Sequence, residues 1–197
     1  KRFTQRQMAS KIAYIPQSHV PSFNFTVNDM VTMGTSAQIS VFHTPGKQQR
    51  MAAAEAMEMM NITHLKDRGY IQLSGGERQL VLIARALAQK AKILIMDEPT
   101  SNLDYGNQIR VLDAVKQLTR NGYTIIQSTH NPDQAFLYAD QVLALQEGVL
   151  NSFGTPKELI NAGLIQALYG IEVELNSLYD DRIRVCVPKS VIRAPLS

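Results

Sequence analysis

Leu-Ser-Gly-Gly-Glu-Arg-Gln, residues 73–79, is the stretch of this sequence that indicates most about its fold and chemistry. Ser74 and Glu77 stand three residues apart, the spacing of a capping box, so we expect a helix to begin after Ser74. Gly75 and Gly76 put no side chain over the first turn, which leaves backbone N–H groups and the positive helix end open to an anion. The residues that follow are apolar on most faces, which indicates a buried helix. The plainer alternative is a Gly-rich turn before a core helix.

Composition narrows the class of protein. The chain has 197 residues, 45% of them hydrophobic, which suits one compact domain or two small lobes. A formal charge of +3 without a dense Lys/Arg run argues against nucleic acid as a partner. Cys186 stands alone, so no internal disulfide can form, and the longest apolar runs are too short to span a bilayer. The His residues are scattered without metal-ligand spacing.

The order of predicted elements indicates an α/β fold. A short strand ends at Pro16, a helix begins at Thr26-x-x-Asp29, and a Met-containing helix covers 47–60. Strands and helices then alternate, which predicts a parallel sheet with right-handed crossovers. We expect buried strands over 92–96, 123–128 and 141–145, a helix over 106–120, capped helices after Asn131 and Thr155, and an edge hairpin over 171–187.

These elements suggest four regions. Residues 1–17 would end a segment of the core, and 18–91 would form an inserted, mainly helical subdomain. Residues 92–170 would make the core itself, and 171–197 a tail with edge strands.

Polar residues follow two of the predicted parallel strands. In open α/β sheets, ligand groups gather at the carboxyl ends of the strands. Asp97 and Glu98 come directly after the first strand, where one carboxylate could coordinate Mg²⁺ and the other could orient or deprotonate a water. His130 follows the second strand, where it could hold a phosphate oxygen or relay a proton. Gln17 could bind Mg²⁺ or water. Each feature also has a purely structural explanation: a solvent-exposed strand end, or a capping His.

Taken together and in order, these residues resemble an ATP-binding-cassette ATPase, over nearly the whole chain. The matching segments are the Q-loop at 13–17, the signature at 73–79, the Walker B strand with its catalytic glutamate at 93–98, the D-loop at 101–104 and the switch histidine at 129–130. The resemblance implies a P-loop NTPase-like (RecA-like) core with an inserted helical signature subdomain.

The resemblance also implies a role for each residue, with ATP and Mg²⁺ as ligands. Asp97 would bind Mg²⁺ through water, Glu98 would activate the attacking water, and His130 would contact the γ-phosphate. Gln17 would link Mg²⁺ to the transport machinery. The signature would grip ATP held by a second, facing ATP-binding subunit, and the D-loop would communicate across that dimer; the residues concerned are Ser74, Gly75, Gly76, Glu77 and Asp104.

One family motif is missing. Nowhere does the sequence contain Gly-x-x-x-x-Gly-Lys-Ser/Thr, the loop that cradles the β- and γ-phosphates; at the only Gly-Lys, 46–47, Val41 and Gln48 replace the first Gly and the Ser/Thr. In the family this loop lies upstream of the Q-loop, and the chain opens with Lys1 rather than Met. We therefore expect a C-terminal portion of a nucleotide-binding subunit that neither binds ATP tightly nor hydrolyses it alone. Its sheet would be incomplete, or the chain would self-associate.

Several stretches look like the ATPases of metal-chelate importers, which serve iron siderophores, haem and cobalamin, with a molybdate/tungstate branch. They are 7–17, 26–34 with Phe42 and Pro45, and 168–173, whereas Thr35 and Gln38 depart from the family pattern. By resemblance, the parent would be a homodimer docked under two transmembrane permease subunits at the cytoplasmic face of a prokaryotic membrane. A substrate-binding protein would feed the permease.

Two alternatives remain open. The chain could be a non-catalytic, truncated cassette that acts as an interaction module. It could also belong to a non-transport ATPase of the same family, although tandem cassettes, a coiled-coil insertion and a basic linker are not visible.

Overall fold

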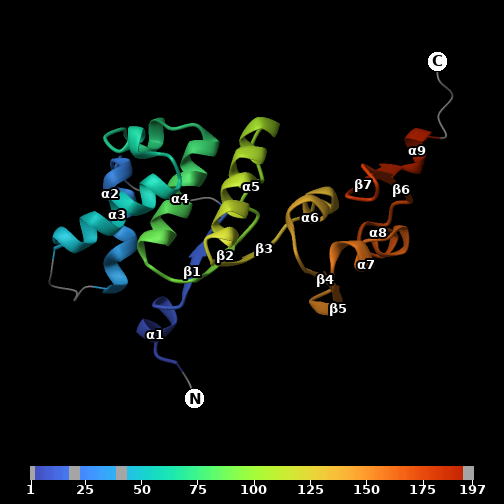
Figure 1. The fold of residues 1–197 in the computed structure, drawn as a ribbon, viewed down its shortest axis with the longest axis horizontal. Coiled ribbons are helices and arrows are strands. Elements are labelled where there is room, and N and C mark those ends of the chain that lie inside the picture. The colour runs from blue at the N-terminus through green and yellow to red at the C-terminus, as the bar shows by residue number, and fades with distance from the viewer. Residues whose placement is uncertain (1–2, 18–22, 39–43, 193–197) are drawn as a thin grey trace. The chain divides into compact units, whose positions relative to one another are not determined.

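The computed structural model describes residues 3–17, 23–38 and 44–192, and it divides into two compact units, 1–128 and 129–197 (Figure 1). Phe42 lies outside the described residues, and so does the side chain of Gln38.

The first unit is built on a three-stranded parallel sheet. Its strands are β1 (Ile12–Ile15), β2 (Ile93–Met96) and β3 (Thr124–Gln127), in the order β1-β2-β3. Ile15 pairs with Met96, and Met96 pairs with Gln127, so the three carboxyl ends meet at one edge of the sheet. The predicted α/β fold with a parallel sheet is confirmed in this unit.

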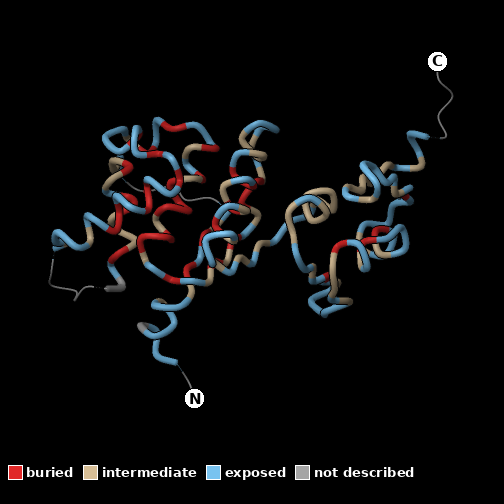
Figure 2. Tube along the Cα trace, viewed as in Figure 1, coloured by how far each residue is buried: buried red, intermediate tan, exposed pale blue. Residues whose placement is uncertain are grey.

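Helices pack against this sheet and on one another, and they form a continuous core with it. They are α2 (Val27–Thr32), α3 (Lys47–Met59), α4 (Gly75–Ala88) and α5 (Tyr105–Arg120), with a short α1 (Gln5–Ala9) before β1 and 3-10 turns η1 (Met33–Gln38), η2 (Thr63–Leu65) and η3 (Tyr70–Gln72) between helices. Buried side chains run from the sheet through α4 into α2 and α3, as the red segments of Figure 2 show.

Local signals predicted the start of α2 and the buried face of α5 correctly. Thr26 caps α2 through a capping box with Asp29, and Val111, Leu112, Val115 and Leu118 form the buried face of α5. The Met-containing helix divides its methionines: Met57 is buried in the core, whereas Met51 is exposed.

Gly34 explains a close approach between η1 and α4. A Cβ atom at Gly34 would collide with the backbone carbonyl of Arg85, so only glycine fits there. The next residue, Thr35, departs from the family pattern noted above. It is completely buried, and its hydroxyl donates to the carbonyl of Thr32 at 2.7 Å.

The prediction of a buried second strand is wrong for β3. Its residues alternate between exposed and half-buried, and Ile126 is 51% exposed. Within the described residues β3 is an edge strand, because β2 is its only neighbour in the sheet. Tyr14 lies on the same uncovered face and is 60% exposed.

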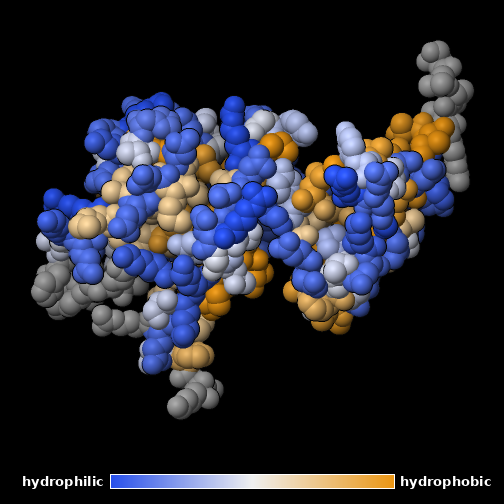
Figure 3. Space-filling model, in the orientation of Figure 1, coloured by the Kyte–Doolittle hydropathy of each residue, from blue (hydrophilic) through white to orange (hydrophobic). Residues whose placement is uncertain are grey.

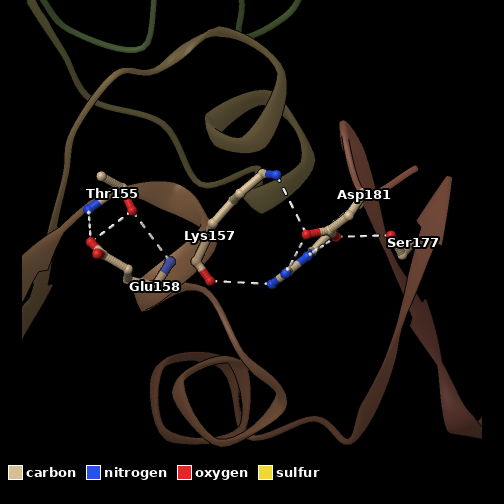
Figure 4. Close-up of polar contacts among 6 residues, drawn as sticks. Thr155, Lys157, Glu158, Ser177 and Asp181 are labelled. Atoms are coloured by element: carbon tan, nitrogen blue, oxygen red, sulfur yellow. Dashed lines mark hydrogen bonds and ion pairs between the residues drawn. The ribbon is translucent and has the colours of Figure 1, made fainter. Parts of the chain in front are cut away.

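The second unit contains two hairpins and several short helices. Its elements are α6 (Pro132–Tyr138), β4 (Val142–Gln146), β5 (Val149–Gly154), α7 (Pro156–Leu159), α8 (Ala162–Tyr169), β6 (Val173–Leu178), β7 (Ile183–Pro188) and α9 (Lys189–Ile192). Asn131 and Thr155 cap α6 and α7 as predicted, with Thr155 and Glu158 forming a capping box (Figure 4).

The prediction that β4 continues a parallel sheet is also wrong. β4 pairs antiparallel with β5, which the sequence pattern did not reveal. Glu147 and Gly148 join the strands with φ of 51° and 78°, the left-handed pair that a two-residue hairpin turn needs. Apolar side chains of this hairpin face outward in Figure 3; they are Leu143, Leu145, Val149, Leu150 and Phe153.

The tail forms the predicted hairpin as a separate two-stranded sheet of β6 and β7. Asp181 organises its turn, because the Arg184 guanidinium donates to both carboxylate oxygens at 2.7 and 2.9 Å (Figure 4). Ser177 and Lys157 also reach the Asp181 carboxylate, at 2.8 and 3.4 Å. These contacts fix the turn and join it to α7.

Candidate nucleotide site

Asp97 and Glu98 lie at the carboxyl edge of the sheet, where Ser128 holds them. The Ser128 hydroxyl, at the end of β3, donates to Asp97 Oδ1 at 2.9 Å and accepts from the backbone N–H of Glu98 at 2.9 Å. Ser128 itself is tied to the end of β2 through the carbonyl of Met96. One hydroxyl therefore fixes the side chain of the first acid and the backbone of the second.

Gln17 contacts the second acid. Its amide nitrogen lies 3.3 Å from Glu98 Oε2 and 2.9 Å from the hydroxyl of Ser101. The same hydroxyl donates to the carbonyl of Glu98 at 2.9 Å. The backbone of Glu98 has φ of 41°, an uncommon value for a residue with a side chain, and these contacts hold it there.

Tyr14 contacts the first acid from β1. Its hydroxyl donates to Asp97 Oδ2 at 3.3 Å. Partial desolvation raises the pKa of Tyr14, and the adjacent Asp97 carboxylate raises it further, so the phenol stays protonated and can donate. Both oxygens of Asp97 thus have a hydroxyl neighbour.

The residues present fit Mg²⁺ as a phosphate-bound ion. The described residues contain no group of three or more His, Cys, Asp or Glu that could hold a metal by themselves. Asp97, with the hydroxyl of Ser128 beside it, offers the hard oxygen chemistry that Mg²⁺ prefers, and Mg²⁺ commonly takes its other ligands from water and substrate phosphates. When bound, the ion would neutralise phosphate charge.

The signature begins α4 with the predicted capping box. The Ser74 N–H donates to Glu77 Oε2 at 2.7 Å, and the Glu77 N–H donates to Ser74 Oγ at 3.3 Å. The hydrogen bond from the Ser74 backbone is the main cause that lowers the pKa of Glu77, and Arg68, 3.7 Å away, adds to it. The cap does not use the N–H groups of Gly75 and Gly76.

The two glycines have a second reason to lack side chains. A Cβ atom at Gly76 would lie 2.5 Å from Asn107 Oδ1, and one at Gly75 would lie 3.0 Å from a methyl group of Leu103. The start of α5 therefore packs directly on the start of α4. The absence of side chains at these two positions thus has a packing reason, in addition to the open N–H groups that the sequence predicts for an anion.

Asn107 connects the signature with the D-loop. Asp104 caps α5 by accepting from the N–H of Asn107 at 2.9 Å, and the Asn107 amide donates to Asp104 at 2.6 Å. The backbone hydrogen bond is the main cause that lowers the pKa of Asp104, followed by the side-chain one. The structure thus brings Asp104 beside Gly76 through one side chain.

His130 lies in the second unit, directly before the N-cap of α6. Its carbonyl accepts a hydrogen bond from the Tyr169 hydroxyl at 3.1 Å. Thr129 supports the same loop, since its hydroxyl accepts from the N–H of Asn131 at 3.1 Å.

Sequence reasoning placed Gln17, Asp97 and Glu98 together, and the structure agrees. It assigned no role to the residues that hold them, Ser128, Ser101 and Tyr14, and it did not notice Asn107. One feature of the sequence could have pointed to Ser128. It follows a predicted parallel strand, and such strand ends lie close to the acids that follow β2. No such feature pointed to Asn107, because its importance depends on how α4 and α5 pack.

The fold and this site define a P-loop NTPase-type domain. A solved structure of a metal-chelate type ABC transporter in an inward-facing conformation superposes with a TM-score of 0.86 at 33% identity, covering 92% of this chain and 75% of that one. The family model for ABC transporters matches residues 1–101. The chain belongs to the ABC transporter family, as an ATP-binding domain.

Its relatives include importer ATPases. An uncharacterized ABC transporter ATP-binding protein of Haemophilus influenzae is 47% identical over 88% of this chain and 66% of its own length. The ferric enterobactin transport ATP-binding protein FepC of Escherichia coli is 36% identical, over 87% of this chain and 64% of its own length. The molybdate import ATP-binding protein MolC of Haemophilus influenzae is 35% identical, over 83% and 64%. The chain thus spans slightly less than two thirds of these relatives.

Proposed function

We propose that this chain is part of the ATP-hydrolysing subunit of an importer for a metal chelate or a metal oxyanion. The observation that carries the proposal is the arrangement of Asp97, Glu98 and Gln17 at the carboxyl edge of the parallel sheet. Phosphoryl transfer to water requires a Mg²⁺ ion on the phosphates and a group that orients the attacking water. Two adjacent carboxylates can serve these two purposes.

Each side chain has a distinct proposed task. Asp97, held by Ser128 and Tyr14, would bind Mg²⁺ through water, and Glu98 would accept the proton of the attacking water. Gln17, hydrogen-bonded to Glu98, would link the Mg²⁺ site to the transport machinery. His130 would contact the γ-phosphate.

The signature would act on a second subunit. Ser74 and the unused N–H groups of Gly75 and Gly76 would bind the γ-phosphate of ATP held by the facing copy, where the positive helix end favours an anion. Glu77 would keep the cap in place, and Asp104 would carry the state of the signature across the dimer.

The names of the relatives support the proposed class of cargo. Ferric enterobactin, molybdate and hemin appear among the cargoes of the relatives, which supports a metal chelate or metal oxyanion as cargo. We propose two transmembrane permease subunits and a substrate-binding protein as partners, and the cytoplasmic face of a prokaryotic cell membrane as the location. No described helix is both long enough and apolar enough to cross a membrane.

The decisive experiment is Glu98→Gln in the complete protein. Loss of the general base should lower the turnover of ATP by about 100-fold or more, while Mg-ATP still binds. Glu58→Gln, an equal change on the exposed side of α3, is the matched control and should leave turnover unchanged. Undiminished hydrolysis with Gln at position 98 would refute the role of Glu98.

Residues 1–197 by themselves should not hydrolyse ATP, because they contain no phosphate-binding loop. Calorimetric titration of this chain with Mg-ATP should show no micromolar binding. If the complete protein were also inactive, the reading as a non-catalytic interaction module would replace our proposal.

A further inference from the structure

The loop that carries His130 is secured from both sides in sequence. On the C-terminal side, the Asn131 side chain accepts from the N–H groups of Asp133 and Gln134 at 2.9 and 3.3 Å. Beside it, the Thr129 hydroxyl lies 3.2 Å from Gln134 Oε1. These contacts shape the start of α6, but they leave the carbonyl of His130 itself to another partner.

That partner lies at the end of α8, 39 residues further along the chain. The Tyr169 hydroxyl donates to the His130 carbonyl at 3.1 Å. Tyr169 is the last residue of α8, and Gly170 ends the helix there with φ of 70°. At the same end of α8, the Gln146 side chain donates to the carbonyl of Ala167 at 3.0 Å. Tyr169 therefore projects from a helix end that is held in place.

A second, independent contact joins the tail to α6, the helix that follows His130. The backbone N–H of Cys186 in β7 donates to Asp133 Oδ1 at 2.9 Å. Ile160, Ile165 and Val173 form the small buried cluster described in this unit, and Phe136 of α6 packs against it. Helix α6 thus packs against this cluster and is also hydrogen-bonded to β7.

We propose that Tyr169 is a positioning residue for the switch histidine, so that the C-terminal segment sets the orientation of His130 during ATP hydrolysis. This inference rests on the proposed function of His130. The hydroxyl binds the backbone carbonyl of His130. It therefore restrains the backbone of the residue that carries the imidazole.

The chemistry of the donor suits the task. Burial raises the pKa of the Tyr169 phenol, so it stays protonated and donates throughout the physiological pH range. A phenylalanine would keep the ring and its packing and would remove only the donor.

The test is Tyr169→Phe in the complete protein, with Tyr179→Phe as the matched control on the exposed tail turn. Loss of one hydrogen bond that acts on a transition-state contact should lower kcat by about fivefold and leave KM for ATP unchanged. The thermal midpoint should stay close to that of the control. The ring signal of His130 in NMR spectra, assigned by its loss in His130→Ala, should shift in Tyr169→Phe and not in Tyr179→Phe.

A double-mutant cycle separates this inference from the proposed function. In a His130→Ala background, Tyr169→Phe should cause no further loss of kcat, because it acts through His130. An equal further loss would overturn the inference, and so would an unchanged kcat and His130 signal in Tyr169→Phe alone. Full activity of His130→Ala would instead refute the proposed role of His130, and the inference with it.

Discussion

Residues 1–128 bury a continuous apolar core that joins a parallel sheet to α2, α3, α4 and α5, whereas the buried cluster described in residues 129–197 contains only Ile160, Ile165 and Val173. The first unit derives its order from side chains that are distant in sequence and packed together. The second relies on helix caps, two hairpins and the contacts of Asp181. The two units should therefore respond to different kinds of mutation.

Gly34→Ala should lower the free energy of unfolding most, because it disrupts a close backbone contact in the core of the first unit. The new Cβ would collide with the Arg85 carbonyl, so η1 and α4 must separate. We expect a loss of at least about 3 kcal/mol in the free energy of unfolding, measured by urea denaturation of the complete protein. Gly106→Ala meets only an ordinary contact with Asp104 at 3.5 Å and should be neutral or slightly stabilising.

A pair of core truncations compares the two units directly. Leu94→Ala opens a cavity in the middle of β2, where the side chain is completely buried, and should cost about 3 kcal/mol. Ile165→Ala should cost less, about 2 kcal/mol, because its small cluster can relax around the gap. Hydrogen exchange resolved by segment can follow each loss in its own unit. A larger loss at Ile165 would show that the second unit depends on core packing after all.

Asn131→Ala tests the role of local caps in the second unit. Removal of the acceptor that serves Asp133 and Gln134 should destabilise α6 by about 1 kcal/mol. Asn131→Asp keeps an acceptor oxygen at the same place and should restore most of the loss. Equal destabilisation by both substitutions, in the same denaturation experiment, would exclude the cap as the cause.

Asp181→Asn should have the smallest effect and a characteristic pH dependence. Hydrogen bonds from Arg184, and then from Ser177, lower the pKa of Asp181 well below its ordinary value of 3.8. The ionised group therefore contributes stability at pH values above 3.8, and this contribution is lost as the pH falls below that value. Thermal midpoints recorded from pH 7 to pH 2 should fall less steeply for the variant.

Asp180→Asn removes the same charge one residue earlier on the turn and serves as the control. It should follow the pH profile of the unchanged protein. If it matched Asp181→Asn instead, net charge rather than the Arg184 contact would explain the effect.

Features that depend on neighbours a few residues apart could be predicted from the sequence alone. The capping boxes at Thr26, Ser74 and Thr155 need a hydroxyl and an acid three residues later, so they are visible in the one-dimensional pattern. The order of the motifs was enough to identify the family, and the acids at 97–98 were enough to locate the candidate site.

The residues that hold this site in place could be identified only in the folded chain. Ser128 meets Asp97 and Glu98 across about 30 positions, and Gln17 meets Glu98 across 81, because parallel pairing brings their strand ends together. Packing of α5 on α4 gives Gly76 its neighbour Asn107. The hydrogen bond from Tyr169 to His130 likewise depends on how α8 packs in the fold, since no local pattern records which distant partner a hydroxyl will meet.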